Sequence, residues 1–167
     1  LKIIAITGSY GKTTMKEVLA AALGEHHTVL KTPDSVNTPL GIARLIIKEL
    51  TPRIDIFIVE MGAYQKGDIK ALCALTPPHI SILTGINEAH LERFGTIENT
   101  IAAKFEIMTS ARPDAAIILN ADDKHIAKEY ARYASGKNIF FYTAKNNSLA
   151  PCSIKYLSLN GIRNVFW

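Results

Sequence analysis

Short apolar runs alternate with amphipathic segments along most of the chain. The runs have the length of strands, whereas the amphipathic segments repeat their apolar residues at the three- and four-residue spacing of one helix face. The expected strands cover 3–6, 28–31, 54–59, 79–84, 115–119 and 139–142. The expected helices cover 15–23, 40–50, 66–75, 97–108 and 123–133. This alternation predicts an α/β fold, with a mostly parallel sheet of the P-loop type and helices on both of its faces.

The last part of the chain departs from this alternation. Residues 153–159 and 163–167 have the composition of strands, and Asn160-Gly161 stands between them. Asn-Gly between two such segments is a strong hairpin signal. We therefore expect a C-terminal antiparallel β hairpin, either at one edge of the sheet or at the start of a further element.

Composition narrows the class of protein. The chain has 167 residues, of which 48% are hydrophobic and 20% charged, as in an ordinary globular domain with a sizeable core. The net charge is +4 and its lysines and arginines are scattered, so we expect no nucleic-acid partner. No apolar run approaches the roughly 18 residues of a membrane span, so we expect no membrane association.

Two further features suggest where the protein resides and how it is organised. Cys73 and Cys152 lie far apart without CxxC spacing, which predicts neither a disulfide nor a zinc site and fits a reducing compartment, the cytoplasm. The sequence begins directly in a strand and without Met. We interpret residues 1–167 as one domain taken from a longer protein.

A glycine-rich segment joins the first expected strand to the first helix. It reads Thr7-Gly8-Ser9-Tyr10-Gly11-Lys12-Thr13-Thr14. Such glycines allow successive backbone N–H groups to point at one anion, and the helix N-terminus adds its positive dipole end. The full phosphate-loop pattern has a further glycine where this chain has Ile6, so the loop is a shortened variant. It predicts binding of nucleotide phosphates, the alternative being a glycine-rich turn without a ligand.

Polar residues follow several of the expected strands. They are Asn37, Glu60, Asn87, His90 and Asn120. Ligands of open α/β sheets bind outside the carboxyl ends of the strands. Each residue alone is explained equally well as a cap or a loop residue. Together with the phosphate loop they predict a Mg²⁺–nucleotide site.

Lys104 falls within an apolar stripe of its expected helix. At about 100° per residue, it shares a narrow stripe with Ile97, Ile101 and Met108. A lysine in that position extends to solvent, is buried at a high cost in free energy, or loses its proton and is chemically modified. The residues by themselves leave these three possibilities open.

Taken together, five stretches resemble the central domain of the Mur ligases. The similarity covers about residues 3–123, and the order and spacing of the stretches match that family. The stretches are 7–14 (TGSYGKTT), 60–62 (EMG), 87–95 (NEAHLERFG), 103–107 (AKFEI) and 120–123 (NADD). Within the family, 90–95 and 67–69 are most similar to the branch that adds a D-alanyl-D-alanine dipeptide.

The resemblance implies a role for each matching residue of the phosphate and metal site. Lys12 would bind the β- and γ-phosphates of ATP, and Thr13 with Glu60 would hold a first Mg²⁺. Glu60 would also hold a second Mg²⁺ together with His90 and a carbamylated Lys104. Carbamylation turns the amine into an anionic ligand, which would account for a lysine in an apolar stripe. Lys12, His90 and Lys104 are thus the expected catalytic residues.

The remaining cofactor-binding residues would contact other parts of ATP. Asn120 would face the adenine, and Asn37 would lie near the transferred phosphate. Gly8, Ser9, Tyr10, Gly11 and Thr14 would complete the loop. The sequence departs from the branch named above at Asn37-Thr38, where paired asparagines are usual, and Thr96 replaces a common serine.

The reaction implied is formation of an amide bond driven by ATP. A carboxylate would take the γ-phosphoryl group, and an amine would then displace phosphate. The partners would be a nucleotide-sugar peptide and an amino acid or dipeptide, bound mainly by domains absent from this chain. We therefore expect the isolated chain to bind ATP weakly and not to catalyse ligation.

Three alternatives belong to other classes or branches. A GTPase-like switch needs Asn-Lys-x-Asp to read its base, and residues 120–123 lack the lysine. A ligase that adds glutamate to folate, or a cyanophycin-type synthetase, would share the fold. A scaffold with a degenerate site is disfavoured because the expected phosphate and metal residues are all present.

Overall fold

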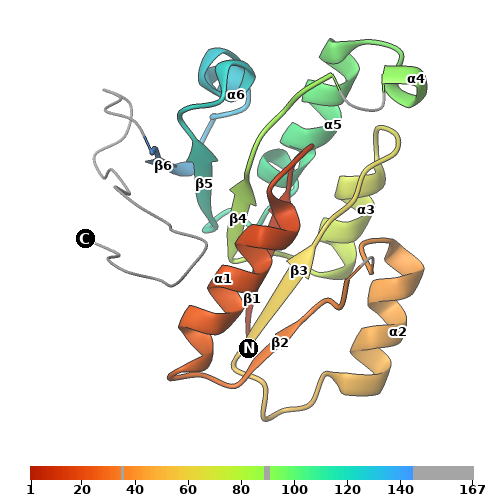
Figure 1. Ribbon diagram of the computed structural model, residues 1–167, viewed down its shortest axis with the longest axis vertical. Helices are drawn as coiled ribbons and strands as arrows, with labels where there is room; N and C mark the ends of the chain where they lie inside the picture. The colour runs from red at the N-terminus through yellow and green to blue at the C-terminus, as the bar shows by residue number, and fades with distance from the viewer. Residues whose placement is uncertain (35, 89–90, 145–167) are drawn as a thin grey trace.

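The computed structural model describes residues 1–34, 36–88 and 91–144. Strands and helices alternate through this part of the chain (Figure 1). The strands are β1 (Lys2–Thr7), β2 (Val29–Lys31), β3 (Ile56–Glu60), β4 (Ile80–Leu83), β5 (Ala116–Asn120) and β6 (Asn138–Tyr142). The helices are α1 (Lys12–Gly24), α2 (Pro39–Glu49), α3 (Asp68–Leu75), α4 (Leu91–Phe94), α5 (Ile97–Thr109) and α6 (Lys124–Glu129), with a 3₁₀ turn at Tyr130–Arg132.

All six strands belong to one sheet and run parallel. Their order across the sheet is β2-β3-β1-β4-β5-β6, which places the first strand in the interior. The predicted α/β fold with a mostly parallel sheet is confirmed. The predicted C-terminal hairpin lies outside the described residues. The helix expected over 123–133 divides into α6 and the 3₁₀ turn, and the one-turn helix α4 was not expected.

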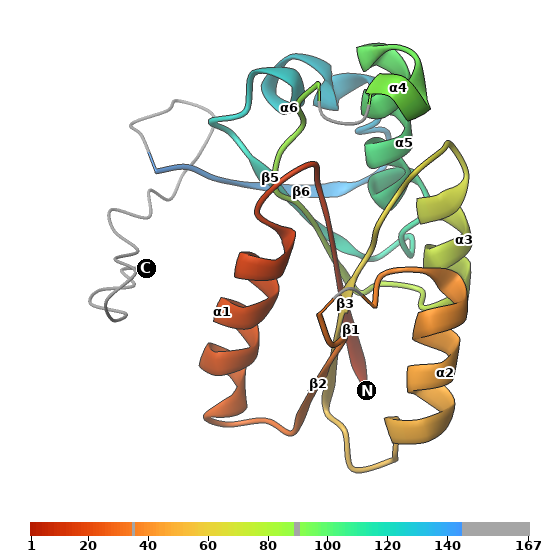
Figure 2. The same ribbon diagram turned by 45° about the vertical axis from the view of Figure 1, so that its right-hand side comes forward.

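Each face of the sheet packs on helices, as predicted (Figure 2). Because side chains of a strand alternate between faces, neighbouring residues enter different cores. The core under α1 contains Ile4, Ile6, Ile56, Ile58 and Ile82, with Met15, Leu19 and Leu23 from the helix. The core on the other face contains Ala5, Phe57, Val59 and Leu83, with apolar residues of α2, α3, α5 and α6.

A carboxylate from α5 caps the neighbouring helix α3. Glu106 accepts hydrogen bonds from the backbone N–H groups of Gly67, at 2.6 Å, and Lys70, at 3.0 Å. The first N–H groups of a helix have no partner within it, and the N-terminal dipole favours a negative charge. Glu106 therefore fixes the beginning of α3 against α5.

None of the helices that the structure describes combines the length and apolar character needed to cross a bilayer.

We predict that Glu106→Ala lowers the free energy of unfolding by about 1–2 kcal/mol, because it removes an N-terminal cap and its charge. Glu49→Ala is the matched control, since Glu49 lies at the end of α2 and forms an exposed ion pair with Lys48. The control should stay within about 0.5 kcal/mol of the parent protein. Urea unfolding measures both, and equal stability of the two variants would contradict the capping role.

Candidate nucleotide site

The loop between β1 and α1 exposes the beginning of the helix. Gly11 is the N-cap of α1 in the left-handed region, with φ of 74°, and no side chain caps the helix there. The first N–H groups of a helix have no intrahelical partner, and such a helix N-terminus can bind an anion. Lys12 opens the helix, and its Nζ donates to the carbonyl of Gly8 at 2.9 Å.

The loop rests on the residues that follow β4. Ser9 N donates to Gly85 O at 2.7 Å, and the hydroxyl of Thr84 lies within hydrogen-bonding distance of the carbonyls of Thr7 and Tyr10. A Cβ atom at Gly8 would lie only 2.1 Å from Thr84 Oγ1 and 3.1 Å from the backbone of Gly85. Gly8 is therefore required by close packing between the loop and the end of β4.

Tyr10 extends from the loop across Gly85. The phenol donates to Asp123 Oδ2 at 2.8 Å, an oxygen that also accepts from Ile86 N. Partial burial, this hydrogen bond and the charge of Asp123 raise the pKa of Tyr10 to about 12, so the phenol stays a donor at neutral pH. A Cβ at Gly85 would lie 2.1 Å from Cζ of Tyr10. The absent side chain at Gly85 thus makes room for the ring.

An apolar cavity lies beside Tyr10 and the start of α1. It has a volume of about 270 Å³, and its lining includes Tyr10, Met15, Val18, Asn120 and Tyr142. The side chain of Asn120 donates to Thr84 O at 2.9 Å and accepts from Asp122 N at 3.0 Å. Asn120 therefore joins the ends of β4 and β5 as well as lining the cavity, and its expected contact with adenine stays a prediction.

Glu60 ends β3 directly beside the beginning of α1. It is 6% exposed, and its Oε2 accepts a hydrogen bond from Thr13 Oγ1 at 3.0 Å. Burial lowers the pKa of Lys12, and the charge of Glu60 opposes this shift. A hydroxyl and a carboxylate oxygen are ligands that suit Mg²⁺, so these residues fit the expected metal. In the described ranges, no three His, Cys, Asp or Glu side chains gather in a metal-binding group.

Lys104 approaches the same loop from α5. It is 4% exposed, so it does not extend to bulk solvent. With Gly8, Lys12, Asn37 and Gly62 it lines a cavity of about 70 Å³. Burial lowers the pKa of Lys104 to about 8, the charge of Lys12 adds to this effect, and Asp68 opposes it. The amine is therefore much more often neutral than that of an exposed lysine.

Asn37 enters that cavity from the segment after β2. The backbone carbonyl of Asn37 accepts a hydrogen bond from Gly62 N at 3.0 Å. A Cβ atom at Gly62 would lie 2.9 Å from the Asn37 side chain. The structure thus brings Asn37, Lys12 and Lys104 to one cavity, and Glu60 to Thr13. His90 lies outside the described residues. The catalytic and ligand roles of these residues stay predictions.

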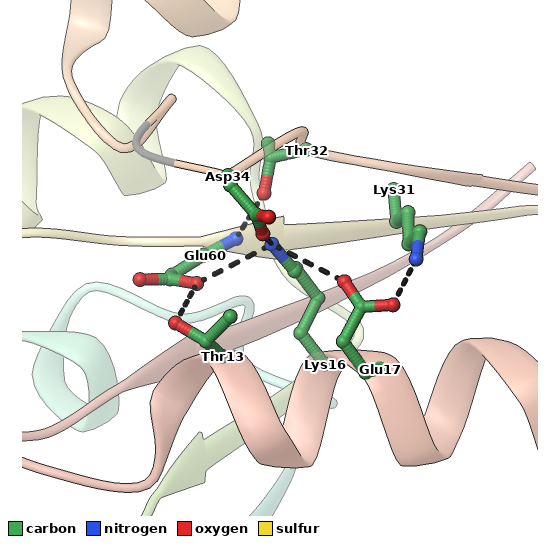
Figure 3. Close-up of polar contacts among 7 residues, drawn as sticks. All are labelled: Thr13, Lys16, Glu17, Lys31, Thr32, Asp34 and Glu60. Atoms are coloured by element: carbon green, nitrogen blue, oxygen red, sulfur yellow. Dashed lines mark hydrogen bonds and ion pairs between the residues drawn. The ribbon is translucent and has the colours of Figure 1, made fainter.

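Sequence reasoning missed one charged residue next to Glu60. Lys16 of α1 is fully buried, and its Nζ lies 3.5 Å from Glu60 Oε2 (Figure 3). Its position three residues after Thr13 was an available signal, because residues three apart share a helix face. Tyr10 was expected as a loop residue, but its bond to Asp123 depends on tertiary packing that no spacing reveals.

The geometry of this edge of the sheet accords with the comparisons to known proteins. The Mur ligase middle domain matches residues 6–162, so the chain belongs to the Mur ligase family. A UDP-N-acetylmuramoyl-tripeptide–D-alanyl-D-alanine ligase of Synechocystis sp. is 34% identical over 141 residues, which cover 84% of this chain and 31% of the relative. The resemblance in the sequence, including the branch it indicated, is confirmed.

Solved structures show the same relationship. The crystal structure of MurF ligase from Thermotoga maritima in complex with ADP has a TM-score of 0.79 and 35% identity, covering 87% of this chain and 33% of that one. The apo form of L. casei FPGS has a TM-score of 0.63 at 15% identity over 84% of this chain and 45% of that one, a likeness of fold alone. The chain thus spans about a third of the length of its similar ligases.

We predict that Gly8→Ala destabilises the protein by about 1–3 kcal/mol, because the added methyl group overpacks against Thr84 and the backbone of Gly85. Gly24→Ala is the matched control, since a Cβ there meets nothing within 4 Å and Gly24 ends α1. That variant should be neutral or stabilised by up to about 1 kcal/mol. Urea unfolding compares the two, and a Gly8→Ala protein as stable as its parent would rule out the tight contact.

Proposed function

We propose that this chain is the ATP-binding central domain of a longer ATP-dependent ligase of peptidoglycan precursor synthesis. Family membership and similarity to named ligases support this assignment, and the similar MurF structure contains ADP. The observation that carries the proposal is the contact of Thr13 with Glu60 beside the exposed beginning of α1. It combines a phosphate-binding loop with oxygen ligands for Mg²⁺.

The proposed substrates are those in the name of the similar ligases, a UDP-N-acetylmuramoyl-tripeptide and D-alanyl-D-alanine. The chain spans about a third of those ligases, so we assign most contacts with both substrates to other parts of the full-length protein. We place the reaction in the cytoplasm, as expected from the sequence, with ATP as the phosphoryl donor.

The loop residues would bind and orient the phosphates of ATP. The N–H groups at the start of α1 would cradle the phosphates, and Lys12 would turn from Gly8 O to the β- and γ-phosphates. Thr13 and Glu60 would hold Mg²⁺, which, when bound, would neutralise part of the phosphate charge. Tyr10 and the cavity beside it would enclose the adenosine end.

The chemistry has two steps. An oxygen of the substrate carboxylate attacks the γ-phosphorus, and ADP leaves, which forms an acyl phosphate. The amine of the second substrate then attacks the acyl carbon, phosphate leaves, and the amine gives up a proton as the amide forms. The chain contributes mainly positioning and charge, since Lys12 and the loop bring two anions together and offset their repulsion.

We further propose that Lys104 carries a carbamate. A neutral amine adds CO₂ and releases a proton, so burial of the amine in the cavity with Lys12 and Asn37 favours the reaction. The carbamate oxygens, with Glu60 and His90, would then hold the second Mg²⁺. The opposite sign of the modified side chain would also relieve its repulsion from Lys12.

The alternatives are less well supported. A GTPase-like switch conflicts with membership of the Mur ligase family and with the missing base-reading lysine between Asn120 and Asp122. Likeness to FPGS concerns the fold and does not extend to its substrate.

We predict that the full-length protein binds ATP at least tenfold more tightly than GTP, a difference of about 1.4 kcal/mol or more, and that Lys12→Met weakens ATP binding by a similar factor. Lys48→Met is the matched control, because this exposed lysine lies in the last turn of α2 and pairs with Glu49. Isothermal titration calorimetry measures all four affinities. Preference for GTP, or equal effects of the two substitutions, would contradict the proposal.

We also predict that ¹³C NMR of the protein with ¹³C-bicarbonate shows a carbamate resonance that is lost in Lys104→Arg and kept in Lys70→Arg. An arginine side chain does not form this carbamate, and Lys70 is an exposed lysine of the neighbouring helix α3. Persistence of the resonance in Lys104→Arg would show that another amine carries the group.

A further inference from the structure

Lys16 is a cation enclosed beside the proposed metal site. The side chain is 0% exposed, and its Nζ lies 3.4 Å from Asp34 Oδ1, 3.5 Å from Glu60 Oε2 and 3.6 Å from Glu17 Oε1 (Figure 3). Neither the phosphate loop nor the expected metal ligands include it. A fully buried ammonium group is costly unless carboxylates compensate it, and Lys16 has such carboxylates beside it.

Among these partners, Glu60 is the buried one. The side chain of Glu60 is 7% exposed, compared with 45% for Glu17 and 83% for Asp34. Water screens the charges of Glu17 and Asp34, whereas Glu60 has little access to it. Glu17 is also paired with Lys31. The interaction of Lys16 with Glu60 is therefore the one that depends most strongly on the lysine.

Both Lys16 and Thr13 approach the same oxygen of Glu60. Thr13 Oγ1 lies 3.0 Å and Lys16 Nζ 3.5 Å from Oε2. The backbone N–H of Glu60 in turn donates to Thr32 Oγ1 at 3.0 Å. Two groups of α1 thus hold Oε2 of Glu60, and Thr32 holds the backbone of Glu60. These contacts restrict the orientation of the other carboxylate oxygen, Oε1.

Lys16 also connects Glu60 to the segment that carries Asn37. Asp34 lies between Thr32, which binds the backbone of Glu60, and Asn37, whose carbonyl binds Gly62. The contact of Asp34 with Lys16 links this segment to α1. One ammonium group therefore joins the helix of the phosphate loop, the end of β3 and the loop after β2.

We propose that Lys16 is a positioning residue, which holds the carboxylate of Glu60 in the orientation that binds the metal of the nucleotide complex. This inference rests on the proposed function. It assigns to Lys16 no contact with ATP or with the metal. Its effect should therefore appear in metal affinity and not in the affinity for metal-free nucleotide.

The test uses the full-length protein and Mn²⁺ as a spectroscopic probe. Free Mn²⁺ is followed by electron paramagnetic resonance during titration of the ADP complex, and ADP binding in EDTA is measured separately by calorimetry. In Lys16→Met, we expect Mn²⁺ affinity to fall at least tenfold, with ADP affinity in EDTA within threefold of the parent. Lys31→Met is the matched control, since Lys31 pairs with Glu17 and is 41% exposed, and it should leave both affinities unchanged.

Two results would overturn the proposal. Unchanged Mn²⁺ affinity in folded Lys16→Met would show that Glu60 needs no such support. Tighter Mn²⁺ binding would show that Lys16 acts only as a repelling charge, because loss of a cation near a metal site favours the metal electrostatically. Absence of Mn²⁺ and ADP binding by the parent protein would instead reject the proposed function.

A stability cycle covers the case in which Lys16→Met folds but is too unstable for the titrations. Lys16→Met, Glu60→Gln and the double variant are compared by thermal unfolding without metal or nucleotide. Because Glu60→Gln removes the buried charge that lacks a partner, the double variant should have a higher Tm than Lys16→Met. If the Tm losses of the two single variants simply add in the double variant, Lys16 and Glu60 are not coupled, and the proposal is overturned.

Discussion

The parallel register of β1 and β3 is the constraint on which the candidate site depends. It sets Ile6 opposite Glu60, so the carboxylate emerges where the chain turns from β1 into the phosphate loop. Alternation along β3 directs Glu60 to the same face as Ile58, the face that α1 covers, and there it meets Thr13. A slip of one residue would turn Glu60 toward the opposite core. The apolar pattern that builds the sheet therefore also sets the geometry of the site.

The two faces of the sheet contribute different parts of this site. α1 brings Thr13 and Lys16 to Glu60 from one face, whereas α5 brings Lys104 to the loop from the other. Lys12 interacts electrostatically with both parts. The charge of Glu60 raises the pKa of Lys12 against the effect of burial, and the charge of Lys12 lowers the pKa of Lys104. The edge of the sheet thus places a cavity lined by Lys12 and Lys104 close to the carboxylate of Glu60, an arrangement that suits the proposed binding of phosphates and of their metal ion.

Much of this arrangement could be predicted from the sequence because its signals are local. Strand and helix periodicity located the elements, and the glycine-rich loop and Glu60 at a strand end indicated the site. The short helix α4 has too few residues for a periodic signal. Lys16 was missed because a lysine on an amphipathic helix ordinarily lies in solvent, and only the approach of β3 and the segment after β2 buries it. The bond between Tyr10 and Asp123 joins residues 113 apart.

The packing of α1 has a consequence for the motions open to the phosphate loop. The helix that begins with Lys12 carries Met15, Leu19 and Leu23 into the core beneath it. Separating that helix from the sheet would expose this apolar layer together with a buried ammonium group. Local unfolding of α1 is therefore tied to the opening of a core, and the hydrogen-bonded amides in the interior of this helix should exchange slowly with solvent as one cooperative unit. The proposed binding of nucleotide then involves rotation of side chains such as Lys12, with the backbone of α1 staying packed on the sheet.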